Sequence, residues 1–294
     1  MNCFIIYLFL LSNFVCTQLH AIIIIQVSPP RSLSTCFLRM MQERGDFQIM
    51  NEPFIAAFCK THGDAPKFRP ESFCTADQVK EAIWYKAKQG SNLFVKDMSC
   101  AVLDALTVDD ALLSCPEVYF IALIRNPHHA LISFYKKILV LDGGTRVRNF
   151  NKMADCFGYK EMYELIKVLK QHARNGVILT LSEDLEINPH AAVRRICEHC
   201  GIEFKPESLS WSPLGADFTG VEEWHEGKIA KATHFWHGDA INSTGFIALP
   251  SYHVDRYGDP TFSEIKSLYD RTLCMRAYGE NKRYYDLIVK ECGA

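Results

Sequence analysis

Short runs of apolar residues alternate with longer amphipathic stretches over the first 180 residues of the chain. Residues 21–27 form a nearly continuous β-branched run, which is typical of a strand buried on both faces of a parallel sheet. Further runs predict four more strands, at residues 47–50, 93–96, 118–124 and 177–181. Helical stretches lie among them, at residues 35–44, 76–89, 101–114, 127–141 and 160–174. This order predicts a three-layer α/β/α domain with a central, mainly parallel five-stranded sheet.

The pattern weakens in the second part of the chain. Asn188 and Pro189 open a further helix, which is predicted to run through His199. Beyond residue 203 the chain is rich in Pro, Gly, Trp and His, which predicts loops rather than a continued alternation of strands and helices. One last helix is predicted near residues 263–277.

No internal repeat or linker divides the chain, so we predict one domain over residues 21–294. Its core is expected at residues 21–201, and residues 202–294 are expected to form an acceptor or lid region and the C-terminal part. Residues 1–20 contain an apolar run that is too short to span a bilayer and that no Lys or Arg precedes. This segment is interpreted as a hydrophobic extension or a signal-like segment. We expect a cytoplasmic protein with no stable membrane span, and secretion or membrane tethering through residues 1–20 is the alternative.

Charge and cysteine content limit the partners of the chain. The 32 Lys and Arg residues are balanced by 34 Asp and Glu residues, which argues against a dedicated nucleic-acid-binding protein but leaves room for a local basic pocket. Among the cysteines, only the pair in Cys197-Glu-His-Cys200 has a spacing like that of metal ligands. Because a zinc site needs a second ligand pair at comparable spacing, we predict no metal.

The first strand runs directly into a loop that can bind an anion. Ser28-Pro-Pro-Arg-Ser-Leu-Ser-Thr35 connects this strand to a helix, so unpaired backbone N–H groups and the positive end of the helix dipole point to one spot. Arg31 adds a charge, and hydroxyl groups are added by Ser32, Ser34 and Thr35. The glycine and lysine spacing of a Walker A motif is absent. An ordinary capped helix with an exposed arginine is the alternative interpretation of this loop alone.

A second strand end repeats the arrangement. The apolar strand at 118–124 is followed by Arg125, and Pro127 suits the first turn of the next helix. Ser133 lies about two turns into that helix. Ligands of open α/β sheets bind at the carboxyl ends of the strands, so two such sites indicate a ligand with two separate anionic groups. A purely structural, salt-bridging Arg125 is the alternative interpretation.

These two segments resemble the signatures of the P-loop sulfotransferases, which take a sulfuryl group from 3′-phosphoadenosine 5′-phosphosulfate (PAPS). Pro30-Arg-Ser-Leu-Ser-Thr35 resembles the 5′-phosphosulfate loop, and Ile124-Arg-Asn-Pro-His-His-Ala-Leu-Ile-Ser-Phe-Tyr135 resembles the 3′-phosphate motif. Ser182-Glu-Asp-Leu-Glu-Ile-Asn-Pro189 resembles a third, supporting segment of the family. The resemblance covers roughly residues 21–201. It implies that PAPS is held by Arg31, Ser32, Leu33, Ser34, Thr35, Arg125 and Ser133.

The sequence departs from the usual pattern of this family at two positions. Leu33 stands where glycine is common, which calls into question the close approach of the backbone to a phosphate. Met98 stands where the cytosolic members have the histidine of a Lys-x-His element. Asn51-Glu-Pro-Phe54 resembles the Glu-Pro element of bacterial and carbohydrate-directed members, which implies a divergent branch in which Glu52 is the base. Lys96 and Arg31 would then stabilise the leaving oxygen.

The resulting hypothesis is sulfuryl transfer from PAPS, by in-line displacement, to a hydroxyl or amine of a small molecule, lipid or glycan. His62 and His225 are the reserve candidates for the base. One alternative is a kinase-like transferase, for which Asp97 is the sole candidate metal ligand at a strand end. The other is a nucleotide-binding module that has lost its chemistry at Leu33 and Met98. The sequence does not predict the oligomeric state.

Overall fold

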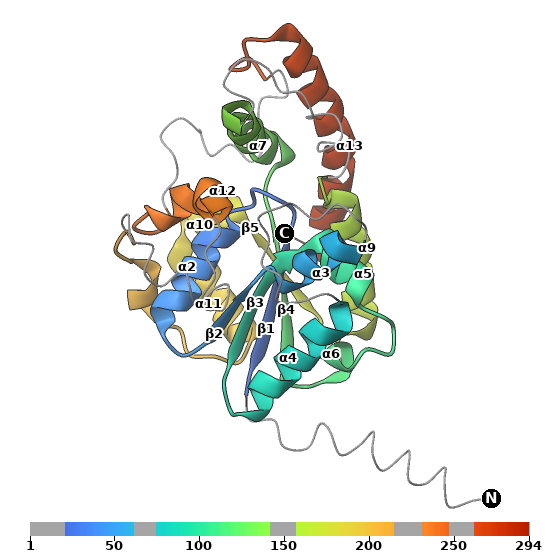
Figure 1. Cartoon of the computed structure of the whole chain (residues 1–294), viewed down its shortest axis with the longest axis vertical. Coiled ribbons are helices and arrows are strands. Elements are labelled where there is room, and N and C mark those ends of the chain that lie inside the picture. Colours follow the sequence, from blue (N-terminus) through green and yellow to red (C-terminus); the bar gives the residue numbers. More distant parts are fainter. Residues whose placement is uncertain (1–20, 62–74, 142–156, 215–230, 247–261, 294) are drawn as a thin grey trace, which may run out of the picture.

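Five parallel strands form a single sheet at the centre of the protein. The computed structural model describes residues 21–61, 75–141, 157–214, 231–246 and 262–293 (Figure 1). The strand order is β2-β3-β1-β4-β5. The bounds of the strands are β1 (Ile23–Ser28), β2 (Gln48–Asn51), β3 (Leu93–Met98), β4 (Val118–Ile124) and β5 (Val177–Leu181). The predicted α/β/α class and its five-stranded parallel sheet are confirmed.

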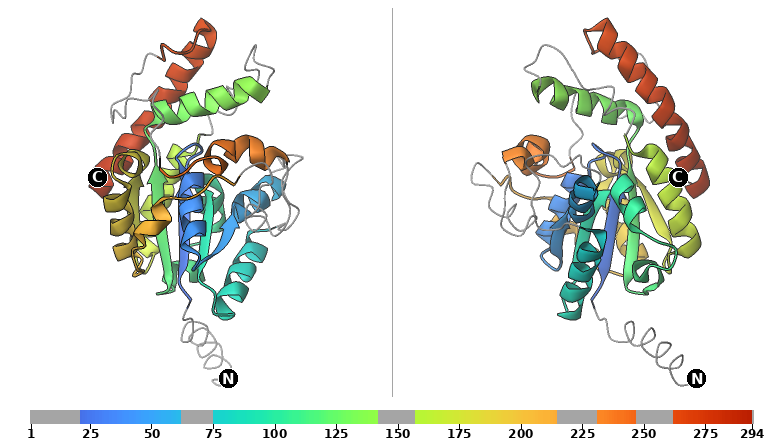
Figure 2. Two further views of the ribbon diagram at one scale, coloured as in Figure 1. Left: turned by 90° about the vertical axis from the view of Figure 1, so that its left-hand side faces the viewer. Right: turned by 45° about the vertical axis from the view of Figure 1, so that its right-hand side comes forward.

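Helices cover both faces of this sheet (Figure 2). The helices before β4 are α2 (Ser34–Arg44), α3 (Pro53–Thr61), α4 (Ala76–Lys88), α5 (Ser99–Ala105) and α6 (Ala111–Ser114). The later ones are α7 (Pro127–Leu141), α9 (Tyr159–His172), α10 (Ser182–Ile187), α11 (Pro189–His199), the 3-10 helix η1 (Pro206–Leu209), α12 (Lys231–Ile241) and α13 (Leu268–Cys292).

The side chains of β1 alternate between two separate hydrophobic cores. Ile23 and Ile25 pack on the face covered by α3, α4, α5 and α9, whereas Ile24 packs on the opposite face with residues of α2 and α11. All three isoleucine side chains are fully buried. The continuous β-branched run of this strand therefore follows from its place at the centre of a sheet that is covered on both sides.

The helix α7 carries the chain beyond the carboxyl edge of the sheet (Figures 1 and 2). It starts just after β4, and the first half of α13 packs against it. The buried hydroxyl of Tyr135 donates a hydrogen bond of 3.0 Å to the carboxylate of Asp270 between these two helices. This contact fixes α7 over the edge at which the predicted anion-binding loops lie.

The structure corrects several helix predictions. The predicted helix at residues 101–114 is interrupted, because the chain leaves α5 at Leu106 and starts α6 after Asp110, whose side chain accepts a hydrogen bond from Leu112 N. The last helix spans residues 268–292 rather than 263–277; Ser267 caps its start and Gly293 ends it. The helices α3, α10 and α12 were not among the predicted helical stretches.

Candidate functional site

The loop between β1 and α2 adopts a backbone that normally favours glycine. Arg31 and Leu33 have φ angles of 62° and 65°, and Leu33 is the N-cap of α2. A left-handed conformation costs a non-glycine residue about 1–2 kcal/mol. Leu33 thus adopts a backbone conformation that glycine would adopt more easily. Replacing the usual glycine by leucine at this position therefore strains the backbone.

This loop rests on the turn before α9. Gly158 has a φ of +82°, and a Cβ at this position would lie 3.0 Å from Ser99 Oγ and 3.6 Å from Pro30 Cδ. Ser99 Oγ also donates a hydrogen bond of 2.8 Å to the Gly158 carbonyl. Only glycine satisfies both the backbone angle and this close packing, so residue 158 is part of the support of the loop.

The side chain of Arg31 joins the two predicted anion motifs. Its Nε donates a hydrogen bond of 3.0 Å to Ser133 Oγ, on α7. Its Nη1 donates to the Trp236 carbonyl at 2.9 Å, and its Nη2 lies 3.5 Å from Asp239 Oδ2, both on α12. Two residues that were assigned to different phosphate groups from the sequence are thus in direct contact.

Arg125 lies in the same part of the molecule and has a carboxylate partner. Its buried guanidinium donates to Glu186 Oε1 at 3.0 Å. Burial raises the pKa of the Cys36 thiol, in the first turn of α2, to about 11, while Arg125 and Arg31 both lower it electrostatically. The charges of both arginines therefore act on the first turn of α2.

The segment at the end of β5 holds both loops in place. The buried hydroxyl of Ser182 lies 2.7 Å from the Ser32 carbonyl and 3.1 Å from the Ile124 carbonyl. It therefore bridges the loop after β1 and the end of β4. Sequence reasoning treated this third motif as supportive only; these contacts explain why it accompanies the other two.

Glu183 fixes the backbone next to Arg125. Its Oε1 accepts a hydrogen bond of 2.8 Å from Asn126 N and lies 3.5 Å from His129 Nδ1. Burial acts to raise the pKa of this carboxyl group, but the hydrogen bonds from His129 and Asn126 and the charge of Arg125 outweigh it, so the pKa lies below its usual value. Glu183 is therefore an ionised group inside the protein.

Lys96 and Glu52 form a buried ion pair at the ends of β3 and β2. Lys96 Nζ lies 2.6 Å from Glu52 Oε1 and 3.2 Å from Asn51 Oδ1. Glu52 has a φ of 58°, and its N–H donates to the Lys96 carbonyl at 2.6 Å. The structure thus brings these two predicted catalytic residues together, and each is the counter-ion of the other.

The carboxylate of Asp97 is hydrogen-bonded to backbone N–H groups at the start of α3. Its carboxylate accepts hydrogen bonds from Phe54 N at 2.6 Å, Ile55 N at 3.1 Å and Met98 N at 2.8 Å. Burial raises the pKa of Asp97 to about 7. The bonds from Phe54 and Ile55 cap a helix whose first residues precede Asp97 by more than forty positions, so the side chain has a structural role.

The first turn of α2 contacts α12. Ser34 is buried, and Thr35 Oγ1 lies 3.0 Å from His237 Nδ1. The ring of Trp236 stacks on Phe134 of α7, with centroids 6.1 Å apart. The sequence analysis had predicted only an acceptor or lid region over residues 202–294. The reserve bases His62 and His225 lie outside the described residues.

In the described part of the chain, no group of three or more His, Cys, Asp and Glu residues is arranged to hold a metal ion. Cys197 and Cys200 are buried, and burial raises the pKa of Cys200 to about 12. Within the same ranges, no helix is both long enough and apolar enough to cross a membrane.

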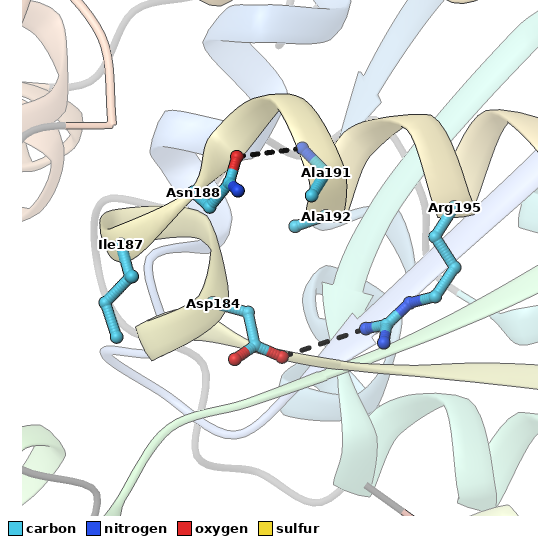
Figure 3. A pocket seen from close by; sticks show the side chains of 6 residues that line it. All are labelled: Asp184, Ile187, Asn188, Ala191, Ala192 and Arg195. Atoms are coloured by element: carbon cyan, nitrogen blue, oxygen red, sulfur yellow. Dashed lines mark hydrogen bonds and ion pairs between the residues drawn. The ribbon is translucent and has the colours of Figure 1, made fainter.

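A pocket of about 320 Å³ lies between α10 and α11 (Figure 3). In Figure 3, Arg195 points toward Asp184, at 3.8 Å, and Asn188 caps α11. None of the predicted site residues lines it. Its lining consists of Asp184, Ile187, Asn188, Ala191, Ala192 and Arg195.

Comparisons with known proteins cover most of the described core. Two family models, each described as a sulfotransferase domain, match residues 22–143 and 106–211. The Arabidopsis thaliana branched-chain-amino-acid aminotransferase-like protein 2 is 28% identical over 214 residues, which cover 71% of this chain and 35% of that protein. The Arabidopsis thaliana branched-chain-amino-acid aminotransferase-like protein 1 is 26% identical over 231 residues, which cover 76% of this chain and 36% of that protein. The chain therefore spans about a third of the length of these curated relatives.

Three solved structures are also similar in outline. The sulfotransferase domain from the curacin biosynthetic pathway is 16% identical, with 90% of this chain and 98% of that chain covered and a TM-score of 0.48. The sulfotransferase domain from the Synechococcus PCC 7002 olefin synthase is 14% identical, with 88% and 96% covered and a TM-score of 0.46. Mouse sulfotransferase SULT7A1, complexed with PAP, is 13% identical, with 68% and 64% covered and a TM-score of 0.43.

Proposed function

Because the chain is a divergent member of the sulfotransferase family, we propose that it transfers a sulfuryl group from PAPS to a hydroxyl or amine acceptor. The observation that carries this proposal is the 3.0 Å contact between Arg31 and Ser133. It joins the loop after β1 to the helix after β4, so one doubly anionic ligand can reach both. A small molecule, a lipid or a glycan can serve as acceptor.

The donor is held at both of its phosphate-bearing ends. Backbone N–H groups of residues 32–35 and the hydroxyls of Ser34 and Thr35 bind the 5′ end at the start of α2. Arg31 stabilises the phosphosulfate, and Arg125 with Ser133 binds the 3′-phosphate. Each contact of this kind is a charge-assisted hydrogen bond.

Transfer proceeds by in-line displacement. The acceptor oxygen or nitrogen forms a bond to sulfur while the bond from sulfur to the bridging oxygen breaks, and 3′-phosphoadenosine 5′-phosphate (PAP) leaves with that electron pair. Arg31 and Lys96 stabilise the charge that develops on the leaving oxygen. Glu52 takes the proton of the acceptor.

The ion pair between Lys96 and Glu52 couples donor binding to the base. A carboxylate that is paired with an ammonium group is a weaker proton acceptor. When the donor arrives, Lys96 turns to its anionic oxygens and releases Glu52. This sequence makes Glu52 more basic only when a sulfuryl group is in place.

The capping role of Asp97 argues against the kinase-like alternative, because three backbone N–H groups already occupy its carboxylate. The binding-module alternative is separated by experiment. Calorimetry with PAP, adenosine 5′-phosphate and ATP is combined with transfer of labelled sulfate from PAPS to phenol, sterol and sugar acceptors. PAP binding without labelled product would support the module, and a preference for ATP would support the kinase.

The role of Arg125 has a selective test. Arg125→Ala is expected to weaken PAP binding about 10- to 100-fold and adenosine 5′-phosphate binding much less, since only PAP carries the 3′-phosphate. Arg195→Ala removes an arginine from the half-exposed outer surface of α11 and is the matched control. Equal losses for both nucleotides would contradict the assignment.

Glu52→Gln tests the base. It is expected to abolish sulfate transfer while PAP affinity stays nearly constant. Because the change leaves the buried Lys96 without its counter-ion, thermal unfolding must accompany the assay. A folded variant with full turnover would remove Glu52 as the base.

A further inference from the structure

One carboxylate oxygen on α12 lies between two cations from other parts of the site. Asp239 Oδ2 is 3.0 Å from Lys137 Nζ, on α7, and 3.5 Å from Arg31 Nη2, on the loop after β1. Neither Lys137 nor Asp239 belongs to a motif that the sequence analysis recognised. The three side chains form a small, charged cluster at the carboxyl edge of the sheet.

The two cations are more firmly placed than the anion. The side chains of Arg31 and Lys137 are 18% and 19% exposed, whereas that of Asp239 is 70% exposed. Arg31 is oriented by its bonds to Ser133 Oγ and to the Trp236 carbonyl. An exposed carboxylate contributes little to such a pair, so it is a replaceable partner of two cations that converge on one point.

The position of Lys137 also follows from α7. It lies four residues after Ser133, and residues with this spacing share one face of a helix. The helix therefore presents a hydroxyl and, one turn farther from the strand end, an ammonium group toward the Arg31 side chain. The neighbouring Lys136 is exposed.

We propose that Arg31 and Lys137 together bind the sulfuryl end of the donor, and that Asp239 occupies this place in the ligand-free protein. The assignment rests on the proposed function, which puts the phosphosulfate on Arg31. Because one carboxylate oxygen lies next to both cations, an oxygen of the sulfuryl group at Arg31 Nη2 is also within reach of Lys137. Lys137 is thus a specificity residue that distinguishes PAPS from PAP.

Asp239 then acts as a competitor of the donor. The sulfuryl oxygens carry negative charge, and this charge replaces that of the carboxylate when PAPS binds. PAP lacks the sulfuryl group, so it can bind while Asp239 keeps both of its partners. This difference predicts that the two nucleotides respond differently to changes at Lys137 and Asp239.

The test is calorimetric titration of PAP and PAPS at one fixed ionic strength. Lys137→Met keeps the aliphatic stem and removes the charge; it is expected to weaken PAPS about 10-fold and PAP less than about 2-fold. Lys137→Arg is expected to restore most of the PAPS affinity. Asp239→Asn is expected to strengthen PAPS binding about 2- to 5-fold. Lys136→Met changes the same charge on the same helix and is the matched control.

Retained PAP binding shows that each variant is folded, so a selective loss of PAPS supports the proposal. Equal losses of PAP and PAPS in Lys137→Met, or equal effects of the Lys136 control, would overturn it. If the unaltered protein binds PAP and PAPS and no Lys137 variant changes either, only this inference fails. If the unaltered protein binds neither nucleotide, the proposed function and this inference fall together.

Discussion

Replacing Ser182 by alanine should uncouple the two anion-binding loops. In the folded protein its buried hydroxyl bridges the Ser32 and Ile124 carbonyls, at 2.7 and 3.1 Å. The alanine variant leaves both buried carbonyls without this donor. A buried polar group that loses its partner costs about 1–3 kcal/mol, so the free energy of unfolding should fall by about this amount.

The structure supplies a control for the loss of a buried hydroxyl. Ser208 is equally buried, and its Oγ donates a hydrogen bond of 2.7 Å to the Lys205 carbonyl three residues away. Ser208→Ala therefore removes a hydroxyl that serves only local structure. Urea unfolding of Ser182→Ala and Ser208→Ala measures the cost to stability, and calorimetry with PAP measures the cost to the site.

The bridging role predicts that the two variants differ in ligand binding. Ser182→Ala should weaken PAP about 5- to 10-fold, which corresponds to roughly 1–1.4 kcal/mol, because the 5′ and 3′ contacts are no longer held at a fixed separation. Ser208→Ala should bind PAP unchanged. Ser182→Thr, which retains a hydroxyl, should recover part of the affinity. If Ser182→Ala loses stability but binds PAP like the unaltered protein, the bridge does not position the ligand.

Three further changes test individual contacts. Glu186→Gln should strengthen PAP binding several-fold, because the neutral amide no longer competes for Arg125; an unchanged affinity in calorimetry would show that the ligand leaves this ion pair intact. Leu33→Gly should be more stable to urea than Leu33→Ala by about 1 kcal/mol, since glycine adopts a positive φ without strain; equal stabilities would contradict this. The lowered pKa of Glu183 contributes stability that is present above its usual value of 4.5 and is lost as the pH falls through the folded-state pKa. Glu183→Gln should therefore flatten the acid side of the stability profile, and an unchanged slope below pH 4.5 would refute that role.

Elements with strong local patterns were predictable from the sequence. The buried strands and α2, α7 and α11 carry their own signals, such as the β-branched run of β1 and the proline at the first turn of α7. The helix α3 also begins with a proline, Pro53, but its capping carboxylate is Asp97, more than forty residues later in the chain. A cap that is supplied by another strand cannot be recognised from nearby residues.

The same distinction applies to the site. Arg31 and Arg125 follow strand ends, and strand ends at one edge of a parallel sheet are close in space, so their common location could be inferred. The partners of these arginines, Asp239 and Glu186, lie 208 and 61 residues away. Glu186 lies in the third segment that resembles the family, but nothing in the sequence pairs it with Arg125, and nothing nearby marks Asp239. The pairing depends on where α10 and α12 lie relative to the sheet edge.

The cations of the candidate site are paired with carboxylates. Among the described residues at the carboxyl edge of the sheet, Asp239 pairs with both Arg31 and Lys137. Glu52 pairs with Lys96, and Glu186 pairs with Arg125. Cations that face one site repel one another, and each carboxylate reduces this repulsion at the cost of competing with a ligand. An anionic donor must exchange with carboxylates rather than simply meet free charges. This exchange provides selectivity, because a ligand with one anionic group can replace one carboxylate at most, whereas a donor with separate 3′ and 5′ groups replaces several. In the proposed mechanism this exchange also gives the chemistry an order, because Lys96 would release Glu52, the proposed base, as the donor binds.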